Sequence, residues 1–311
     1  MKTVFMFPGQ GAQAVGMGAD LFERYASVRE AYERASEAID VDLASLSFEG
    51  PEDELRKTVN TQPALLVASY AALAATLEQG VEPWAVAGHS LGEYTALAAA
   101  GSLTLEDAVR AVRERGRLMY EAGLETEGTM AAIIGLAEPD VEAIIGDASG
   151  SGTVEIANLN SPTQIVISGE VPAVERAVAL AEERGARRAV RLKVSGAFHS
   201  RLLENAARGM ERVLASIPFE EPRAIFVANV TGGVAEDPEV IRANLVRQLT
   251  SPVRWVDSME TLAGLGAGLF VELGPGNVLR GLLRKIDRSL TSVGVGKSQD
   301  IEALAKAVEE L

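Results

Sequence analysis

The sequence predicts an α/β fold, and three observations lead to that prediction. Short apolar strands alternate with helical patterns in residues 1–127 and again in residues 195–311, which indicates a parallel sheet with helices on its faces. Residues 128–194 follow the order β-α-β-β-α-β, which is that of the ferredoxin-like module. A Gly-x-Ser-x-Gly box at residues 88–92 lies between a strand and a helix, as in hydrolase-like sheets. We therefore expect a hydrolase-like subdomain (1–127 and 195–311) that carries an inserted ferredoxin-like subdomain (128–194).

The elements before the insertion are predicted from apolar runs and from apolar residues at helical spacing. A strand at residues 3–7 leads into a glycine loop, and a buried strand at residues 84–87 leads into the Gly-x-Ser-x-Gly box. The helical patterns lie at residues 19–38, 52–58, 64–79, 93–100 and 105–122.

The insertion is predicted from its change of rhythm. Its strands are expected at residues 130–136, 154–158, 164–168 and 187–194, with helices at 139–147 and 171–184. The αβ alternation then resumes, with helices at 200–217, 237–249 and 277–286 and strands at 224–230, 269–273 and 290–294. A cleft between the two subdomains is the natural place for a ligand.

Composition excludes several classes of function. The net charge of −15 argues against nucleic acid or an anionic membrane surface as the main partner. There is no cysteine, which excludes disulfides and thiol catalysis, and two histidines leave little for a metal centre. The longest apolar stretch, residues 64–77, falls short of the roughly 20 residues that span a bilayer. We expect a soluble, cytoplasmic protein without a metal.

Ser90 is the candidate nucleophile. Glycines on both sides let the backbone bend sharply, so that its hydroxyl stands clear of the sheet with the N-terminal N–H groups of the next helix beneath it. The alternative is a serine that merely caps the helix. The strand before the box and the helix after it favour the nucleophile.

A serine hydroxyl needs a base, and His199 is the candidate. The other histidine, His89, directly precedes Ser90, and successive side chains near a strand end point to opposite sides. His199 lies at a predicted loop-to-helix junction, where a structural histidine bound to backbone is the alternative. The pairing with Ser90 makes catalysis the better interpretation.

Arg115 is the only charged residue on the apolar half of the helix predicted at residues 105–122. A buried guanidinium is costly unless a carboxylate or phosphate meets it. An internal Asp or Glu partner and a ligand carboxylate are both open at this point.

Two further patterns have competing interpretations. The loop at residues 9–14 fits the loose dinucleotide pattern G-x-G-x-x-A, but the second strand that a Rossmann site needs is replaced by a helix. The loop is better placed to bring a second backbone N–H beside Ser90, with Leu91 as the first donor. The cations Arg187, Arg191 and Lys193 form a stripe that is either a solvated edge or a docking surface for an anionic partner.

Seven segments, in order over essentially the whole chain, resemble the malonyl-CoA:acyl carrier protein transacylases. They are GQGAQ at 9–13, GHSLGEY at 88–94, RG at 115–116, NLNSP at 158–162, AFHS at 197–200, QL with PVRW at 248–255, and ELGPG at 272–276. The resemblance implies that Ser90 takes a malonyl group from malonyl-CoA, that His199 is its base, and that Arg115 holds the malonyl carboxylate. It implies no permanently bound cofactor, since phosphopantetheine is carried by the partner protein.

The resemblance also implies roles for positioning groups. Backbone amides of Gln10 and Leu91 would form the oxyanion hole. A backbone carbonyl at Gln248 would orient the histidine, and Asn160 matches a polar residue of the cleft.

The implied reaction is ping-pong transfer of malonyl to the phosphopantetheine thiol of acyl carrier protein, which supplies fatty acid biosynthesis. Because that carrier is acidic in the systems of this family, we expect it to dock on Arg191 and Lys193, with Arg201 or with Arg284 and Lys285. A monomer is expected. Two rivals stay open: a serine hydrolase, such as a thioesterase or patatin-like lipase, that uses the same box, and a non-catalytic subunit that kept the fold.

Overall fold

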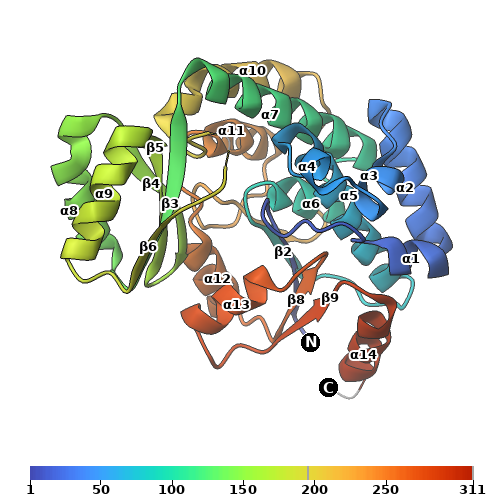
Figure 1. Cartoon of the computed structure of the whole chain (residues 1–311). Coiled ribbons are helices and arrows are strands. Elements are labelled where there is room, and N and C mark those ends of the chain that lie inside the picture. The colour runs from blue at the N-terminus through green and yellow to red at the C-terminus, as the bar shows by residue number, and fades with distance from the viewer. Residues whose placement is uncertain (195, 310–311) are drawn as a thin grey trace.

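The computed structural model describes residues 1–194 and 196–309. The subdomain boundary expected at residue 195 and the last residues of the larger subdomain, 310–311, lie outside the described residues. Figure 1 shows a large body of helices around one sheet, beside a smaller body that contains α8 and α9. The helices of the large body are α1 (Ala19–Arg24), α2 (Ala26–Ile39), α3 (Leu43–Phe48), α4 (Glu52–Leu55), α5 (Thr58–Leu77), α6 (Gly92–Ala99), α7 (Leu105–Glu125), α10 (Glu204–Ala215), α11 (Pro238–Gln248), α12 (Trp255–Gly264), α13 (Val278–Ile286) and α14 (Ser298–Glu309).

The sheet of the large body is parallel, as the sequence predicts. Its strands run in the order β7-β2-β1-β8-β9, and each neighbouring pair is parallel. Side chains alternate between its faces: Val4 and Met6 pack with α12 and α13, whereas Phe5 and Phe7 pack with α2, α5, α6 and α7. The strands are β1 (Thr3–Phe7), β2 (Ala85–Gly88), β7 (Ile225–Val227), β8 (Leu269–Leu273) and β9 (Ser292–Val295).

The smaller sheet is antiparallel and has the predicted ferredoxin-like order, β4-β5-β3-β6. One face is covered by α8 and α9, which lie together at the left of Figure 1. The other face turns Met130 and Val166 toward the main core. The elements are β3 (Gly128–Ile134), α8 (Glu138–Ala148), η1 (Ser149–Ser151), β4 (Val154–Ser161), β5 (Gln164–Glu170), α9 (Val171–Glu183) and β6 (Arg188–Arg191), followed by η2 (Arg201–Leu203).

The structure corrects the predicted elements at several places. The helix predicted at 19–38 is two helices, because Tyr25 is extended between α1 and α2, and this break lets Phe22 pack against Tyr32. The strand predicted at 187–194 ends at Arg191, so Lys193 lies beyond the sheet. Helices α3, α12 and α14 were not predicted.

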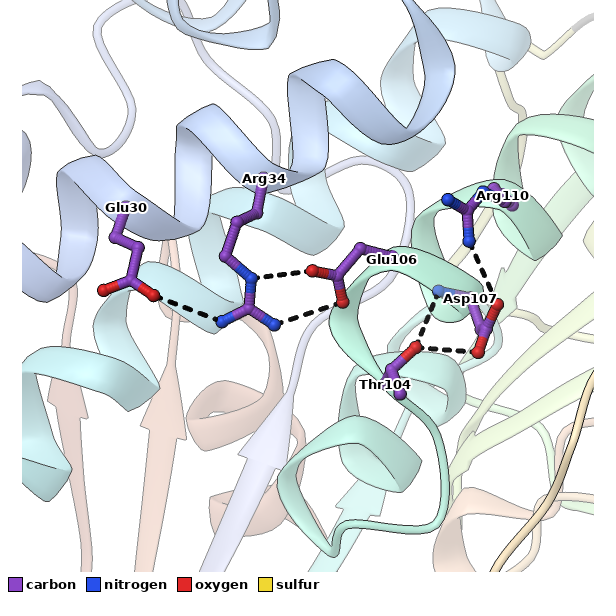
Figure 2. A network of polar contacts seen from close by, with 6 residues as sticks. All are labelled: Glu30, Arg34, Thr104, Glu106, Asp107 and Arg110. Carbon is purple, nitrogen blue, oxygen red and sulfur yellow. Dashed lines mark hydrogen bonds and ion pairs between the residues drawn. The ribbon is translucent and has the colours of Figure 1, made fainter.

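The beginning of α7 is tied to α2, and this fixes the helix that carries Arg115. Figure 2 shows the Arg34 guanidinium of α2 facing the Glu106 carboxylate of α7. Arg34 donates two hydrogen bonds to Glu106, from Nε to Oε1 at 2.7 Å and from Nη2 to Oε2 at 3.1 Å. Thr104 caps the first turn by accepting a hydrogen bond from the Asp107 amide at 3.1 Å.

Candidate active site

Ser90 lies on a sharp turn between β2 and α6, with a φ of 52°, which is uncommon for a residue with a side chain. The neighbouring glycines make the turn possible. A Cβ on Gly88 would lie 1.9 Å from the carbonyl oxygen of Gly92, and a Cβ on Gly92 would lie 2.1 Å from that of Phe7. The box thus lets α6 pack directly against β1 and β2, with Ser90 at the carboxyl edge of the sheet.

Ser90 and His199 meet, although 109 positions separate them. The Ser90 Oγ lies 2.8 Å from His199 Nε2, and His199 Nδ1 lies 2.8 Å from the backbone oxygen of Gln248. A carbonyl oxygen only accepts hydrogen bonds, so Nδ1 carries the proton and Nε2 is the acceptor for the serine hydroxyl. The three groups have the geometry of an activated nucleophile.

The imidazole of His199 is neutral near pH 7. Burial, together with the positive charge of Arg115, lowers the pKa of His199 to about 3. His199 also has a positive φ, of 58°. A neutral imidazole with a free Nε2 is the form that accepts a proton from serine.

Arg115 is buried, 1% exposed, and reaches the nucleophile. Its Nη2 donates to Ser90 Oγ at 3.1 Å and to the side-chain oxygen of Gln248 at 2.8 Å, and its Nη1 donates to that of Gln62 at 3.0 Å. Its Nε is buried and has no hydrogen-bond partner among residues 1–194 and 196–309. Within the described residues no carboxylate forms an ion pair with Arg115, so the guanidinium is held by neutral oxygens.

A second set of polar groups supports the turn and was missed by sequence reasoning. Asn229 accepts a hydrogen bond from the Ser90 amide at 2.7 Å and donates to the Gly88 carbonyl at 2.6 Å. The buried Glu93 accepts from the Asn229 amide at 2.9 Å and from the side-chain amide of Gln248. Asn229 lies 139 positions from Ser90 and 136 from Glu93, and no local pattern links it to the turn.

A cavity of about 120 Å³ lies beside the nucleophile. Its walls include Ser90, Arg115 and His199, and also Gln10 and Leu91, the two residues expected to supply backbone amides. Its other walls, to which the sequence analysis gave no role at the site, are His89, Met119, Met130, Asn158, Leu192, Val194 and Phe198.

Asn160 does not line this cavity. Its Oδ1 lies 2.7 Å from His89 Nε2, so it holds the histidine that is not paired with Ser90. Burial lowers the pKa of His89 as well.

The cations expected to dock a partner differ in their surroundings. Arg191 forms an ion pair with Glu175 at 3.3 Å, and Arg201 binds Glu155. Lys193 forms no ion pair within the described part of the chain, and it lines a hollow of about 450 Å³ that shares Gln10 and Val194 with the cavity at Ser90.

Neither a metal centre nor a membrane span is found in residues 1–194 and 196–309. No three His, Asp or Glu side chains gather there in a way that could hold a metal ion. No helix there is long and apolar enough to cross a bilayer.

Comparison with known proteins gives a consistent result. The sequence model of the acyl transferase domain matches residues 4–305. The chain is 43% identical over 310 residues to the malonyl CoA-acyl carrier protein transacylase of Bacillus subtilis (strain 168), covering 99% of this chain and 98% of that one. Its fold is similar to the crystal structure of acyl-carrier-protein-S-malonyltransferase from Bartonella henselae, with a TM-score of 0.96, 42% identity and coverage of 99% and 100%.

A third relative was solved with its partner. It is a malonyl-transacylase in complex with a type II PKS acyl-carrier protein, and it is similar to this chain with a TM-score of 0.96 and 40% identity, covering 99% of this chain and 100% of that one.

Proposed function

The chain belongs to the acyl transferase domain family, and on that premise we propose that it transfers malonyl from malonyl-CoA to the phosphopantetheine thiol of an acyl carrier protein. The observation that carries the proposal is the convergence of Ser90, His199 and Arg115 on one small cavity. A nucleophile with a buried guanidinium 3.1 Å from its oxygen suits an acyl group that ends in a carboxylate.

The transfer has two half-reactions. In the first, Ser90 Oγ attacks the thioester carbonyl as His199 Nε2 takes the hydroxyl proton, and the tetrahedral oxyanion rests on the amides of Leu91 and Gln10. The C–S bond then breaks, and the imidazolium returns the proton to the departing coenzyme A thiolate. In the second, the carrier thiol gives its proton to His199, attacks the malonyl ester, and Ser90 leaves with that proton.

Every step uses side chains and backbone of this chain, so we propose that no permanently bound cofactor takes part. Gln248 is a positioning residue, because its backbone oxygen holds the His199 ring and its side-chain oxygen holds Arg115. We propose that Asn160 acts on the site indirectly, because it holds His89, which lines the cavity.

Intact-protein mass spectrometry tests the proposal. On mixing with malonyl-CoA, the protein should gain the mass of one malonyl group, located at Ser90 by peptide mapping. Adding the carrier with its phosphopantetheine should remove that mass and place it on the carrier. Absence of any adduct from the wild-type protein would support a non-catalytic subunit instead.

The same experiment separates transfer from hydrolysis. A thioesterase or lipase would release free malonate rapidly without any thiol, whereas a transacylase should keep the adduct until a thiol arrives. Arg115 favours transfer of malonyl, since a lipid site needs no guanidinium on an apolar helix face. Rapid malonate release in buffer alone would favour the hydrolase.

We propose that the carrier approaches the mouth marked by Lys193. The hollow there is lined by Arg56, Lys57, Lys193 and one carboxylate, Asp53. Arg56 and Lys57 pair with Glu52 and Glu54, whereas Lys193 forms no ion pair in the described part of the chain. A hollow of about 420 Å³ on the side of His199 is instead lined by three carboxylates, Glu138, Glu142 and Glu155, against one cation, Arg254. An acidic carrier and the phosphate of its arm should favour the basic mouth.

Reversing the charges of Arg191 and Lys193 (Arg191→Glu with Lys193→Glu) should raise the KM for the carrier about tenfold, with little change in the KM for malonyl-CoA. The defect should shrink in high salt, because exposed charges are screened. Arg176→Glu, an exposed cation on α9, is the matched control and should leave both KM values unchanged. Equal effects on carrier and malonyl-CoA would contradict this docking site.

Three broader statements are also proposals. Residues 1–127 with 195–311, and residues 128–194, form two subdomains. An apolar cluster that lies wholly within residues 131–181 supports this division, and Met130, Ala157 and Val166 join the smaller subdomain to the main core. The chain acts as a monomer. It works in the cytoplasm.

A further inference from the structure

Glu93 is a fully buried carboxylate that the two half-reactions do not use. It lies three residues after Ser90, in the first turn of α6, and is 0% exposed. A buried carboxylate is costly unless it is paired or hydrogen-bonded. No Lys, Arg or His forms an ion pair with Glu93 in the described part of the chain; its partners are the backbone amide of Asn229 and the side-chain amide of Gln248.

Gln248 joins Glu93 to the site. Its Nε2 donates to Glu93 and, at 3.0 Å, to the Ser90 carbonyl, while its Oε1 accepts from Arg115 Nη2 at 2.8 Å. The two ends of a glutamine amide have nearly the same shape, so the partners decide which end points where. A carboxylate only accepts hydrogen bonds. Glu93 and the Ser90 carbonyl therefore both require the NH₂ end of Gln248, which turns the oxygen end toward Arg115.

The arrangement places opposite charges one amide apart. The Arg115 charge is compensated by Glu93 through Gln248, and the two groups do not touch. A direct, bidentate carboxylate would take two of the five guanidinium N–H groups and neutralise the charge that a ligand carboxylate would meet. Here Nε has no partner, and Nη2 rests on the Ser90 hydroxyl.

We infer that Glu93 is a positioning residue for malonyl selectivity: it orients the Gln248 amide so that Arg115 stays compensated yet available to the carboxylate of the acyl group. The inference rests on the function proposed above and assigns a residue to its specificity. The hydrogen bond to Asn229 gives Glu93 a second role, since the Asn229 side chain accepts from the Ser90 amide and donates to the Gly88 carbonyl.

The variant Glu93→Gln tests the inference, because glutamine keeps the shape but has a single acceptor. In the variant, an NH₂ group replaces one of the two carboxylate oxygens. This NH₂ group faces either the Asn229 N–H or the Gln248 NH₂ and cannot accept a hydrogen bond from it. The ratio of malonyl to acetyl acylation rates at Ser90 should fall about 10- to 100-fold, the loss expected from one misoriented buried hydrogen bond. Equal slowing of both acyl groups, or an unchanged ratio, would overturn the inference.

Two companion variants keep the test independent of folding. Gln248→Leu removes the amide but keeps the backbone oxygen on His199, so it should reproduce the loss of selectivity, and the double variant should lose little more. Additive losses of selectivity in the double variant would contradict the inference that Glu93 acts through Gln248. Glu272→Gln is the matched control: Glu272 is also 0% exposed and bound to two amides, those of Leu279 and Arg280, but lies outside the site. It should leave the ratio unchanged.

The pH profile gives a further readout. Burial raises the pKa of Glu93 to about 7, so the wild-type malonyl-to-acetyl ratio should rise as pH increases through 7 and the acceptor-only form takes over. The groups that face Glu93 are Arg115 and Tyr94; burial raises the pKa of Tyr94 and lowers the pKa of Arg115, His89 and His199. The rise should be absent in Glu93→Gln, and its persistence there would contradict the assignment. Formation of the wild-type adduct tests the proposed function separately.

Discussion

Replacing His199 with alanine should slow the formation of the malonyl ester on Ser90 by about 10²–10⁴-fold, the usual contribution of a positioned general base. The imidazole is the only acceptor within hydrogen-bond range of Ser90 Oγ among the described side chains, at 2.8 Å, while Arg115 only donates to it. Without Nε2 the hydroxyl must lose its proton to water. Quenched-flow mass spectrometry of the adduct measures the rate directly.

The pH dependence of the same step provides a second check. Because the pKa of His199 is lowered to about 3, the imidazole stays unprotonated from pH 5 upward, and its titration should add no acidic limb in that range. Ser90→Ala sets the background, since it cannot form the adduct. A His199→Ala protein that acylates as fast as the wild type would show that another group is the base.

Replacing Arg115 with alanine should reverse the preference among acyl groups. Malonyl transfer should fall about 10²-fold or more, because the carboxylate would enter a buried site that has lost its cation. Acetyl transfer should fall much less, since an uncharged acyl group gains nothing from the guanidinium. The measurement is kcat/KM for malonyl-CoA and acetyl-CoA, compared as a ratio.

Arg117→Ala is the matched control, two residues further along α7. Arg117 is exposed and, among the described residues, pairs only with Glu114 and Glu121, so its loss should change kcat/KM for neither substrate measurably. An Arg115→Ala protein with an intact malonyl preference would refute the role of Arg115 in binding the malonyl carboxylate. The selectivity would then have to come from the cavity walls.

Sequence patterns predicted the fold well where the pattern is local. The short, doubly buried strands and the β-α-β-β-α-β order gave both sheets, because period and composition are set by neighbouring residues. The break at Tyr25 has no Gly or Pro to mark it, and it accompanies a tertiary contact, the packing of Phe22 against Tyr32. The strand predicted to Val194 failed because alternating charge persists after the chain has left the sheet at Arg191.

The candidate site divides along the same line. Ser90 was identified from the Gly-x-Ser-x-Gly box, and Arg115 was identified as the only charged residue on the apolar half of its predicted helix. Glu93, Asn229 and Gln62 carried no such signal. Asn229 holds Ser90 across 139 positions and Gln62 meets Arg115 across 53, so their roles depend on tertiary structure. Of the two partners that the sequence left open for Arg115, an internal carboxylate forms no ion pair with it among the described residues, and the ligand carboxylate stays a prediction.

The cation beside the nucleophile also influences the base. After burial, the charge of Arg115 is the largest cause of the low pKa of His199. An incoming malonyl carboxylate would cancel that charge and make the imidazole more basic at the moment its substrate arrives. Water or an acetyl group brings no such change, so His199 would stay a weak base in the empty enzyme. Selectivity for malonyl would then arise from the increased basicity of His199 as well as from the binding of the acyl chain.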